Sequence, residues 1–598
     1  MTETPTIIHH LEANAKRQGA RAAIHDKTTG SWRRRNWREY NNLTRRFGKA
    51  LIAADFGEGD PLAILGANRP EWAIGALGAM RVGGISAGIY TSCSAEEIGY
   101  ILDHSEAPIA LVETLDQLSR IIEVWPTLDK LKSVVLMEGA GESDDERVSS
   151  WEDFLETGSD VTDEELDARM DALRPDQVAD FIYTSGTTGP PKAVMLTHEN
   201  LEWTARTIGG TVNLGTEDVA LSYLPLSHIA EQTNSLLMPM VFGYQVYFCH
   251  NGLELAVYLP EVRPTTFFGV PRVWERFESG IRAKMAEATG AKAKIAAQAQ
   301  QVGREYIAAR NAGKTPGGLL EKKFQIADKL VFSKVKEAIG LDRCRVFVSG
   351  AAPIPASSLE FFSSLGITVT ELYGQSEGSG PTSTNLEGAN KYGTVGRAIP
   401  GVEVKIAEDG EILVRGKNLF AGYYKNQAAT DETIIDGWLH SGDLGKLDSD
   451  GFLSIIGRKK DIIITSGGKN IAPQNIEELL SGIDIVGTPL VVGEQQRYLI
   501  ALLTLDEEYA PTFAEQHGLD AASLHDDPFV RSHLEKAIQA DVNSQLARVE
   551  HIRNFSVLTA PFTIEGGELT PTLKLKRNVV NEKFLDEINA CYERGQEL

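Results

Sequence analysis

Apolar, β-branched runs alternate with amphipathic helical stretches over residues 1–400, and this alternation constrains the fold more than any other feature of the chain. Runs that end in Gly or Ser turns are typical of strands, and they include DFIYTS (180–185), ALVE (110–113), RVFVSG (345–350) and ITVTELYG (367–374). Stretches with helical spacing lie between them, among them LTRRFGKALIAA and PEWAIGALGAMRVGG. Because strands that alternate with helices form sheets covered on both faces, we predict an α/β fold with layered, largely parallel sheets.

Beyond residue 400 the pattern changes to hairpins. VEVKIAEDGEILVRG (402–416) and GKLDSDGFLSIIGR (445–458) turn at EDG and DSDG, which predicts a β-rich subdomain. The run that begins at GRKKD leads to a last, smaller α+β unit. Since 598 residues exceed what one hydrophobic core organises, we predict two domains, 1–457 and 458–598, with a helical insertion at about 282–337.

Composition excludes several classes of protein. The net charge of −24 argues against bulk nucleic-acid binding, which needs a cationic surface. The longest nearly apolar run, 235–248, is shorter than a bilayer span, and the start of the chain does not resemble a signal peptide. We therefore expect a cytoplasmic protein. The chain has four cysteines, Cys93, Cys249, Cys344 and Cys591, and they form no CxxC pair. Their spacing therefore indicates neither a zinc site nor a disulfide framework.

The segment YTSGTTGPPKAV (183–194) is crowded with small residues and contains one lysine. It does not fit a Walker A loop, because Pro191 stands where the second Gly is required and Ala193 follows Lys192 in place of Ser or Thr. Pro191 also has no N–H to offer a phosphate. The segment is therefore not the signature of a P-loop NTPase.

The same segment still has the chemistry of an anion-binding loop. Gly186 and Gly189 allow the backbone to approach an anion closely, and Lys192 is a point charge suited to outer phosphates. Hydroxyl donors are supplied by Ser185, Thr187 and Thr188. A plain Gly-rich turn is the alternative interpretation.

YTSGTTGPPKAVMLTH resembles the signature loop of the acyl-adenylate-forming superfamily, with Ala193 in place of the usual Gly. Further motifs follow in the family's order, so that the resemblance spans about residues 20 to 580. Three of them are similar to the bacterial long-chain fatty acid–CoA ligase branch: LSYLPLSHIAE (221–231), FFGVPRVWERF (267–277) and YGQSEGSGPTS (373–383).

The resemblance implies a reaction in two halves. A fatty acid carboxylate attacks the α-phosphate of ATP, which gives acyl-AMP and pyrophosphate, and the thiol of coenzyme A then displaces AMP. Positioning anions and neutralising charge are the main tasks of such a site. The resemblance also implies Mg²⁺ as the cofactor, and a small, mobile C-terminal domain that alternates between the two half-reactions.

The resemblance assigns roles around the nucleotide. Tyr373 would stack on adenine, and Ser376, where the family usually has Thr, would donate to the α-phosphate. Asp443 in HSGDLG would accept both ribose hydroxyls, with Arg458 as a second ribose contact. The full set expected at ATP or AMP is Thr184, Ser185, Gly186, Thr187, Thr188, Gly189, Lys192, Gly350, Ala351, Tyr373, Gly374, Gln375, Ser376, Asp443, Arg458 and Lys574.

Four residues are expected to be catalytic. Glu377 would be the magnesium ligand, with the hydroxyl of Thr184 nearby. Lys574 in ELTPTLKLKR aligns with the family's adenylation lysine, although Lys576 is two residues away. His228 matches the residue whose ring gates the pantetheine channel. A surface ion pair for Glu377 and a buried, hydrogen-bonded ring for His228 are the alternatives.

The second half-reaction depends on three further elements. Lys460 would be the hinge, within residues 458–461. Ser466, Gly467 and Gly468 would approach the pantetheine arm of CoA. Trp274 would gate the acyl tunnel, plain core packing being the alternative.

The insertion between Arg282 and Glu337 carries 12 Lys and Arg against five acids. We hypothesise that it contacts anionic membrane at the inner face, near the entrance for the fatty acid. The oligomeric state stays open, with a dimer as one alternative.

A fatty acyl-AMP ligase or a carrier-protein-loading enzyme is the alternative function. A luciferase-like oxygenase is disfavoured because nothing demands oxygen chemistry. A non-enzymatic regulator is disfavoured because Glu377, Asp443 and Lys574 are all present.

Overall fold

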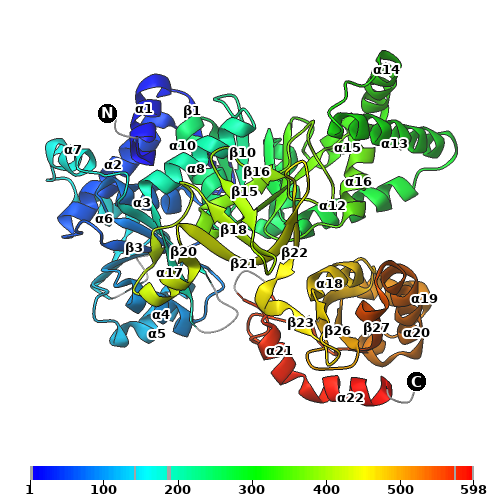
Figure 1. Cartoon of the computed structure of the whole chain (residues 1–598). Coiled ribbons are helices and arrows are strands. Elements are labelled where there is room, and N and C mark those ends of the chain that lie inside the picture. Colours follow the sequence, from blue (N-terminus) through cyan, green and yellow to red (C-terminus); the bar gives the residue numbers. More distant parts are fainter. Residues whose placement is uncertain (1–4, 140–142, 144, 185–189, 571–573, 596–598) are drawn as a thin grey trace.

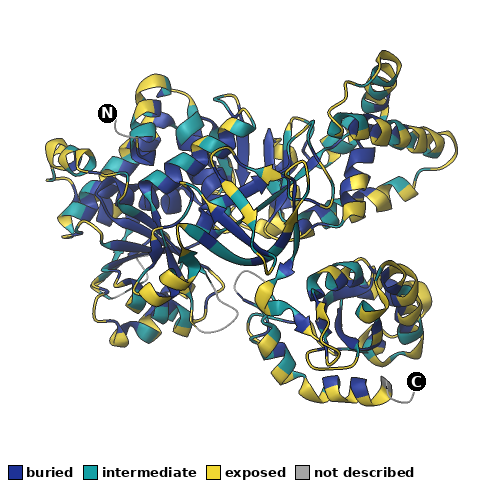
Figure 2. Ribbon diagram, in the orientation of Figure 1, coloured by how far each residue is buried: buried dark blue, intermediate teal, exposed yellow. Residues whose placement is uncertain are grey.

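The computed structural model describes residues 5–139, 143, 145–184, 190–570 and 574–595. Ser185, Gly186, Thr187, Thr188 and Gly189 of the expected phosphate loop lie outside the described residues. Figure 1 shows a large domain and, beyond it, a smaller C-terminal domain, as predicted. Most strands of the large domain are dark blue in Figure 2, because helices cover the sheets.

The first large sheet has nine strands, β1 (Ala22–Asp26), β2 (Arg33–Asn36), β10 (Val219–Ser222), β11 (Gln245–Phe248), β12 (Thr266–Gly269), β13 (Val346–Gly350), β14 (Val369–Gln375), β15 (Gly380–Thr384) and β16 (Arg397–Ala398). Their order across the sheet is β16-β15-β14-β13-β12-β10-β11-β1-β2. The strands from β14 to β1 pair in parallel. Antiparallel strands close both ends, so that the predicted parallel sheet is confirmed for its interior.

The second large sheet has eight strands, β3 (Pro61–Leu65), β4 (Ile85–Ile89), β5 (Ile109–Val112), β6 (Ser133–Leu136), β7 (Val148–Ser150), β8 (Val178–Thr184), β9 (Lys192–Thr197) and β19 (Gly422–Tyr423). Their order is β19-β9-β8-β4-β3-β5-β6-β7. Strands β8 and β9 pair antiparallel, with Thr184 opposite Lys192. The phosphate-loop segment therefore joins two strands of a hairpin, whereas a Walker A loop leads from a strand into a helix.

Helices cover these sheets because each helix carries its apolar residues on one side. Helix α2 (Trp37–Ala53) shows the reason: Asn36 caps its first turn, and Trp37, Tyr40 and Phe47 are buried against the core. The other helices around the two sheets are α1 (Ile7–Gln18), α3 (Pro70–Arg81), α4 (Ala95–Ser105), α5 (Leu115–Val124), α6 (Trp151–Thr157), α7 (Asp163–Asp171), α8 (His198–Thr211), α9 (Ile229–Gln232), α10 (Met238–Phe242), α11 (Leu255–Val262), α16 (Ala356–Ser364) and α17 (Gln427–Thr433).

The insertion forms a helical projection at one side of the large domain (Figure 1). It contains α12 (Pro271–Ala286), α13 (Gly290–Asn311), α14 (Gly318–Ala327), a π-helical turn (Asp328–Phe332) and α15 (Ser333–Ala338). Residues 312–317 separate α13 from α14.

The predicted hairpins form a five-stranded subdomain. Its strands are β17 (Glu403–Ile406), β18 (Glu411–Arg415), β20 (Ile434–Ile435), β21 (Trp438–Leu447) and β22 (Leu453–Arg458). β17 pairs with β18 and β21 with β22, both antiparallel, as the sequence predicts.

The C-terminal domain has apolar cores of its own, built on residues 463–592. Its strands are β23 (Ile463–Ile464), β24 (Asn470–Ile471), β25 (Val486–Val492), β26 (Leu499–Leu505) and β27 (Ile552–Val557), and its helices are α18 (Pro473–Ser481), α19 (Ala510–His517), α20 (Pro528–Ala537), α21 (Arg577–Lys583) and α22 (Leu585–Gly595). Within the described part of the whole chain, no helix combines the length and apolarity needed to cross a bilayer.

Candidate active site

Asp443 is held between a tyrosine and an arginine. Its carboxylate accepts a hydrogen bond from Tyr373 Oη at 2.7 Å and forms an ion pair with Arg458, whose Nε lies 3.2 Å away. Arg458 lies directly across the antiparallel pair of β21 and β22, so that strand register brings the two residues together. The side chain of Asp443 is almost fully buried. An oriented carboxylate with lone pairs left over can accept further hydroxyl donors.

The turn before Asp443 is shaped by its own polar contacts. Gly442 adopts φ +72°, in the left-handed region that favours glycine, and its N–H donates to Glu411 Oε1 at 2.9 Å. Glu411 also contacts His440 Nδ1 and Lys459 Nζ, each at 3.1 Å. Sequence reasoning missed Glu411, because its partners come together only when β18 pairs with β21.

Glu377 and Lys192 converge on Tyr423, a residue that the sequence analysis did not single out. Glu377 Oε1 accepts a hydrogen bond from Tyr423 Oη at 2.7 Å, and Lys192 Nζ lies 4.9 Å from the centre of the Tyr423 ring. Burial, and then the charge of Glu377, raise the pKa of Tyr423. β19 pairs with β9, which sets Tyr423 opposite Val194 and close to Lys192. The glutamate expected at the metal and the lysine expected at the phosphates therefore belong to one site.

Thr184 ends β8 beside the start of β9, and its hydroxyl donates to the backbone oxygen of Lys192 at 3.4 Å. Among the described residues, Thr184 and Glu377 share no hydrogen bond. No group of three or more His, Cys, Asp or Glu side chains that could hold a metal occurs in the described ranges either. Glu377 would therefore meet a cation as a lone carboxylate.

Close backbone packing holds the run that carries Tyr373, Gln375 and Ser376. A Cβ atom on Gly374 would lie 1.7 Å from the carbonyl oxygen of Gly380, at an irregularity in the pairing of β14 with β15. Only glycine fits there. Gly350 ends the neighbouring β13, where a Cβ would lie 3.1 Å from Leu372 O, and Ala351 follows with φ +71°.

Lys574 reaches this group from the C-terminal domain. Its backbone is held by Thr570, whose N–H donates to Lys574 O at 2.8 Å. Desolvation, and then the positive charge of Arg458, lower the pKa of the Lys574 amine. The negative charges of Glu377 and Asp443 act in the opposite direction. Lys574 thus lies within the electrostatic reach of the residues expected at the ribose and at the metal.

His228 lies close enough to Lys574 to feel its charge. Burial, and then that charge, lower the pKa of His228 to about 4, so that the ring is neutral at physiological pH. Its Nδ1 accepts a hydrogen bond from the N–H of Ala230 at 3.1 Å, at the start of α9. The proton of the neutral ring is therefore on Nε2. His228 is half-buried and hydrogen-bonded, and its role stays a prediction.

The expected hinge residue lies within electrostatic reach of this group, and the turn expected at CoA is exposed. Ser466, Gly467 and Gly468 lie in the exposed turn between β23 and β24. Lys460 lies in a short 3₁₀ turn, Lys459–Asp461, just after Arg458. Burial and the charge of Arg458 lower the pKa of Lys460. Their assignments stay predictions.

Trp274 is fully buried at the start of α12. Its Nε1 donates to Val348 O at 3.3 Å, and its ring centre lies 5.5 Å from Phe267 and 5.1 Å from Phe362. Burial among aromatic rings is expected both for a closed gate and for a core residue, so both interpretations of Trp274 stand.

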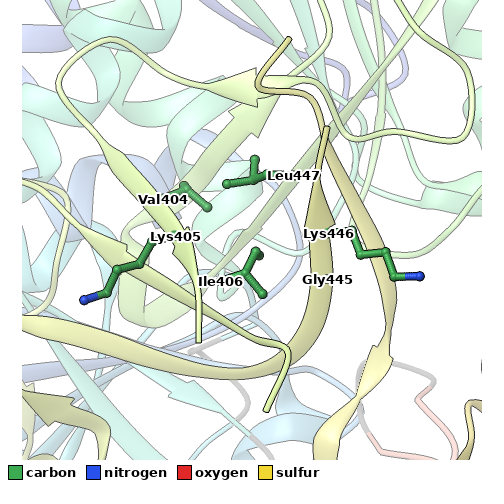
Figure 3. A pocket seen from close by; sticks show the side chains of 6 residues that line it. All are labelled: Val404, Lys405, Ile406, Gly445, Lys446 and Leu447. Atoms are coloured by element: carbon green, nitrogen blue, oxygen red, sulfur yellow. The ribbon is translucent and has the colours of Figure 1, made fainter. Parts of the chain in front are cut away.

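A separate hollow lies in the hairpin subdomain. Val404, Ile406 and Leu447 line it and face one another, whereas Lys405 and Lys446 extend away (Figure 3). None of the candidate residues lines it, although its Gly445 is two residues from Asp443 on β21.

The fold and the convergent residues fit an enzyme that binds a nucleotide. The sequence profile of AMP-binding enzymes matches residues 11–424, and that of the AMP-binding enzyme C-terminal domain matches residues 460–596. The chain therefore belongs to the AMP-binding, adenylate-forming enzyme family, which confirms the resemblance stated from its motifs.

Relatives and solved structures agree with this family. The chain is 37% identical to the long-chain-fatty-acid–CoA ligase ACSBG2 of Xenopus laevis, over 98% of this chain and 84% of that protein. It superposes with a TM-score of 0.74 on the adenylation domain of a carboxylate reductase from Mycobacterium chelonae, at 21% identity over 98% and 91% of the two chains. The TM-score is 0.67 against the Bacillus subtilis o-succinylbenzoate–CoA synthetase with ATP and magnesium, at 21% identity over 96% and 99%. These two structures bear on the fold alone.

Proposed function

We propose that the protein activates a long-chain fatty acid with ATP to acyl-AMP and pyrophosphate, and then transfers the acyl group to coenzyme A. One observation carries the proposal: Lys574, from the C-terminal domain, lies near Glu377 and Asp443 of the large domain. A cation within electrostatic reach of the carboxylates proposed to bind the ribose and the metal is suited to neutralise charge that develops at the α-phosphate. The full-length likeness to a long-chain-fatty-acid–CoA ligase supports the choice of substrate.

In the first half-reaction the chain's own residues mainly position anions. Asp443 would accept the ribose hydroxyls while Arg458 holds its carboxylate in place. The ring of Tyr373 would stack on adenine while its hydroxyl keeps its bond to Asp443. Lys192 would steady the outer phosphates, and Lys574 would bridge the attacking carboxylate and the α-phosphate.

Magnesium fits this set of donors. A hard cation that takes most of its ligands from phosphates and water needs only one or two protein oxygens, and Glu377 offers a carboxylate held by Tyr423. Glu377, with the hydroxyl of Thr184, would hold the ion. When bound, Mg²⁺ neutralises phosphate charge.

In the second half-reaction the C-terminal domain would turn about Lys460, between the proposed domains 1–457 and 458–598, and replace Lys574 with the turn of Ser466, Gly467 and Gly468. That turn is exposed and therefore free to approach pantetheine. A rotation at a few backbone torsions is a common means of domain rearrangement. The neutral His228 ring would line the path of the thiol, and Trp274 would gate the acyl tunnel.

The enzyme is proposed to work in the cytoplasm with peripheral contact to an anionic membrane, and its oligomeric state, a dimer among the alternatives, is not assigned. A fatty acyl-AMP ligase that stops at the adenylate, or loads a carrier protein, is the alternative function.

A coupled assay with ATP, Mg²⁺, CoA and acids of graded chain length tests the proposal. We expect AMP and acyl-CoA in equal amounts, with the highest kcat/KM for long chains, because each buried methylene contributes about 0.8 kcal/mol. Formation of acyl-AMP and pyrophosphate without thioester would favour the alternative.

A further inference from the structure

The outer face of α14 and α15 combines apolar and basic side chains, all exposed. Leu319, Ile326 and Leu330 are exposed by 71%, 60% and 49%. The lysines on the same face recur at three- and four-residue spacing with them, so that one side of the helical segment carries both kinds. We call this surface the docking face, and it consists of Leu319, Lys322, Lys323, Ile326, Lys329, Leu330 and Lys334.

The opposite face of the same segment is packed against the rest of the domain. Phe324 stacks on Tyr306 of α13, with ring centres 3.9 Å apart, and lies 5.5 Å from Phe332. Ala327 and Phe332 are buried. The exposure of the three apolar residues is therefore not a sign of a loosely attached segment, since the helices already have one apolar face against the domain.

Two of the three acids of this segment are occupied elsewhere, and the third, Glu337, is exposed near the end of α15. Glu321 accepts a hydrogen bond from Tyr306 Oη at 2.8 Å. Asp328 is paired with Lys336 at 2.9 Å and also accepts from Ser333. Among the described residues, the four lysines of the docking face form no ion pair, and their charges are therefore unneutralised.

We propose that the docking face binds the surface of an anionic phospholipid membrane. Residues 282–337 carry 12 Lys and Arg against five acids, whereas the whole chain has a net charge of −24, so that positive charge is concentrated where the apolar side chains are exposed. A helix face with lysines beside large aliphatic residues fits the interface between lipid headgroups and acyl chains. A protein partner would need a complementary acidic and apolar surface, for which nothing in this chain argues.

The docking face is joined to the proposed acyl site by continuous packing. Ala327 and Phe332, on the inner side of the segment, belong to the same buried cluster as Trp274, Ile281 and Phe362. Membrane binding here would bring a lipid-dissolved fatty acid to the side of the domain that contains Trp274. The docking face specifies the peripheral membrane contact of the proposed function, and this last step rests in addition on the proposed chemistry.

Vesicle co-sedimentation of the full chain tests the proposal. We expect binding to phosphatidylcholine vesicles that contain phosphatidylglycerol, weaker binding to phosphatidylcholine alone, and loss at high salt. The variant K322E/K323E/K329E/K334E should lower binding at least tenfold, and L319Q/I326Q/L330Q should lower it severalfold. Matched controls change exposed residues elsewhere, K130E/K132E/K446E/K536E and I122Q/V549Q/L585Q, and should bind as the parent does.

Equal binding by parent and docking-face variants, or no binding by the parent, would overturn the proposal. A change of oligomeric state in these variants without lipid, measured by sedimentation velocity, would do the same, since a second copy would then cover the face. Acyl-CoA formation from detergent-dispersed fatty acid separates the two proposals. It should be unchanged in the docking-face variants, so that a failure of docking leaves the proposed function intact.

Discussion

Replacement of Asp443 by Asn tests the ribose-binding geometry. Asp443 is 6% exposed, and its carboxylate accepts a hydrogen bond from Tyr373 Oη at 2.7 Å and is ion-paired with Arg458 Nε at 3.2 Å. Asn keeps the shape but has one acceptor oxygen and no charge, so that it cannot serve Arg458 and two ribose hydroxyls together. A hydrogen bond to a charged group contributes about 1.5–3 kcal/mol. Loss of one such bond should raise KM for ATP about 10- to 150-fold.

The assay is pyrophosphate release at saturating fatty acid with ATP varied. We expect kcat to fall less than kcat/KM, because Asp443 does not touch the reacting phosphorus. Tyr373→Phe is the matched control: it keeps the ring for stacking and leaves Arg458 on the carboxylate, so that its effect on KM should be smaller. A folded Asp443→Asn protein with an unchanged KM for ATP would refute the assignment.

Three further predictions concern the core, the backbone and the metal. Burial raises the pKa of Asp180 to about 8, so the native state keeps a proton that the unfolded chain loses near pH 4, and stability falls as pH rises between these values. The Tm advantage of Asp180→Asn should therefore grow from pH 5 to 8; a constant difference would contradict this. Gly374→Ala should abolish adenylation because its Cβ would lie 1.7 Å from Gly380 O. Gly467→Ala should slow only thioester formation, because its Cβ would lie 3.9 Å from Thr465 Oγ1, an ordinary contact. Pyrophosphate and acyl-CoA measurements distinguish the two, and loss of pyrophosphate release in Gly467→Ala would count against the CoA assignment. Glu377→Gln should raise the Mg²⁺ concentration for half-maximal activity, and an unchanged Mg²⁺ dependence would remove Glu377 from the metal site.

Local sequence patterns predicted the elements of this fold well. The run 345–350 corresponds to β13, and the turn signals EDG and DSDG correspond to the two hairpins. These succeed because side-chain periodicity and turn chemistry act between neighbours in the chain.

The candidate site could not be assembled in this way. Tyr423 contacts both Glu377 and Lys192, yet its position depends on the pairing of β19 with β9. Nor does any local pattern bring Lys574 to Asp443, because their approach depends on how the two domains sit against each other. Only the ordered set of motifs indicated that these residues act together.

Separate measurement of the two half-reactions in Lys574→Ala is the most direct test of the proposal that Lys574 acts in adenylation. Pyrophosphate release from ATP and fatty acid measures adenylation, and thioester formation from supplied acyl-AMP and CoA measures transfer. We expect adenylation to fall at least 100-fold, since loss of one preorganised charge contact at a transition state costs about 3–4 kcal/mol, while transfer stays close to that of the parent. Lys576→Ala, the neighbouring control, should keep both. Equal loss of both half-reactions in Lys574→Ala, or the same selective loss in Lys576→Ala, would contradict the account.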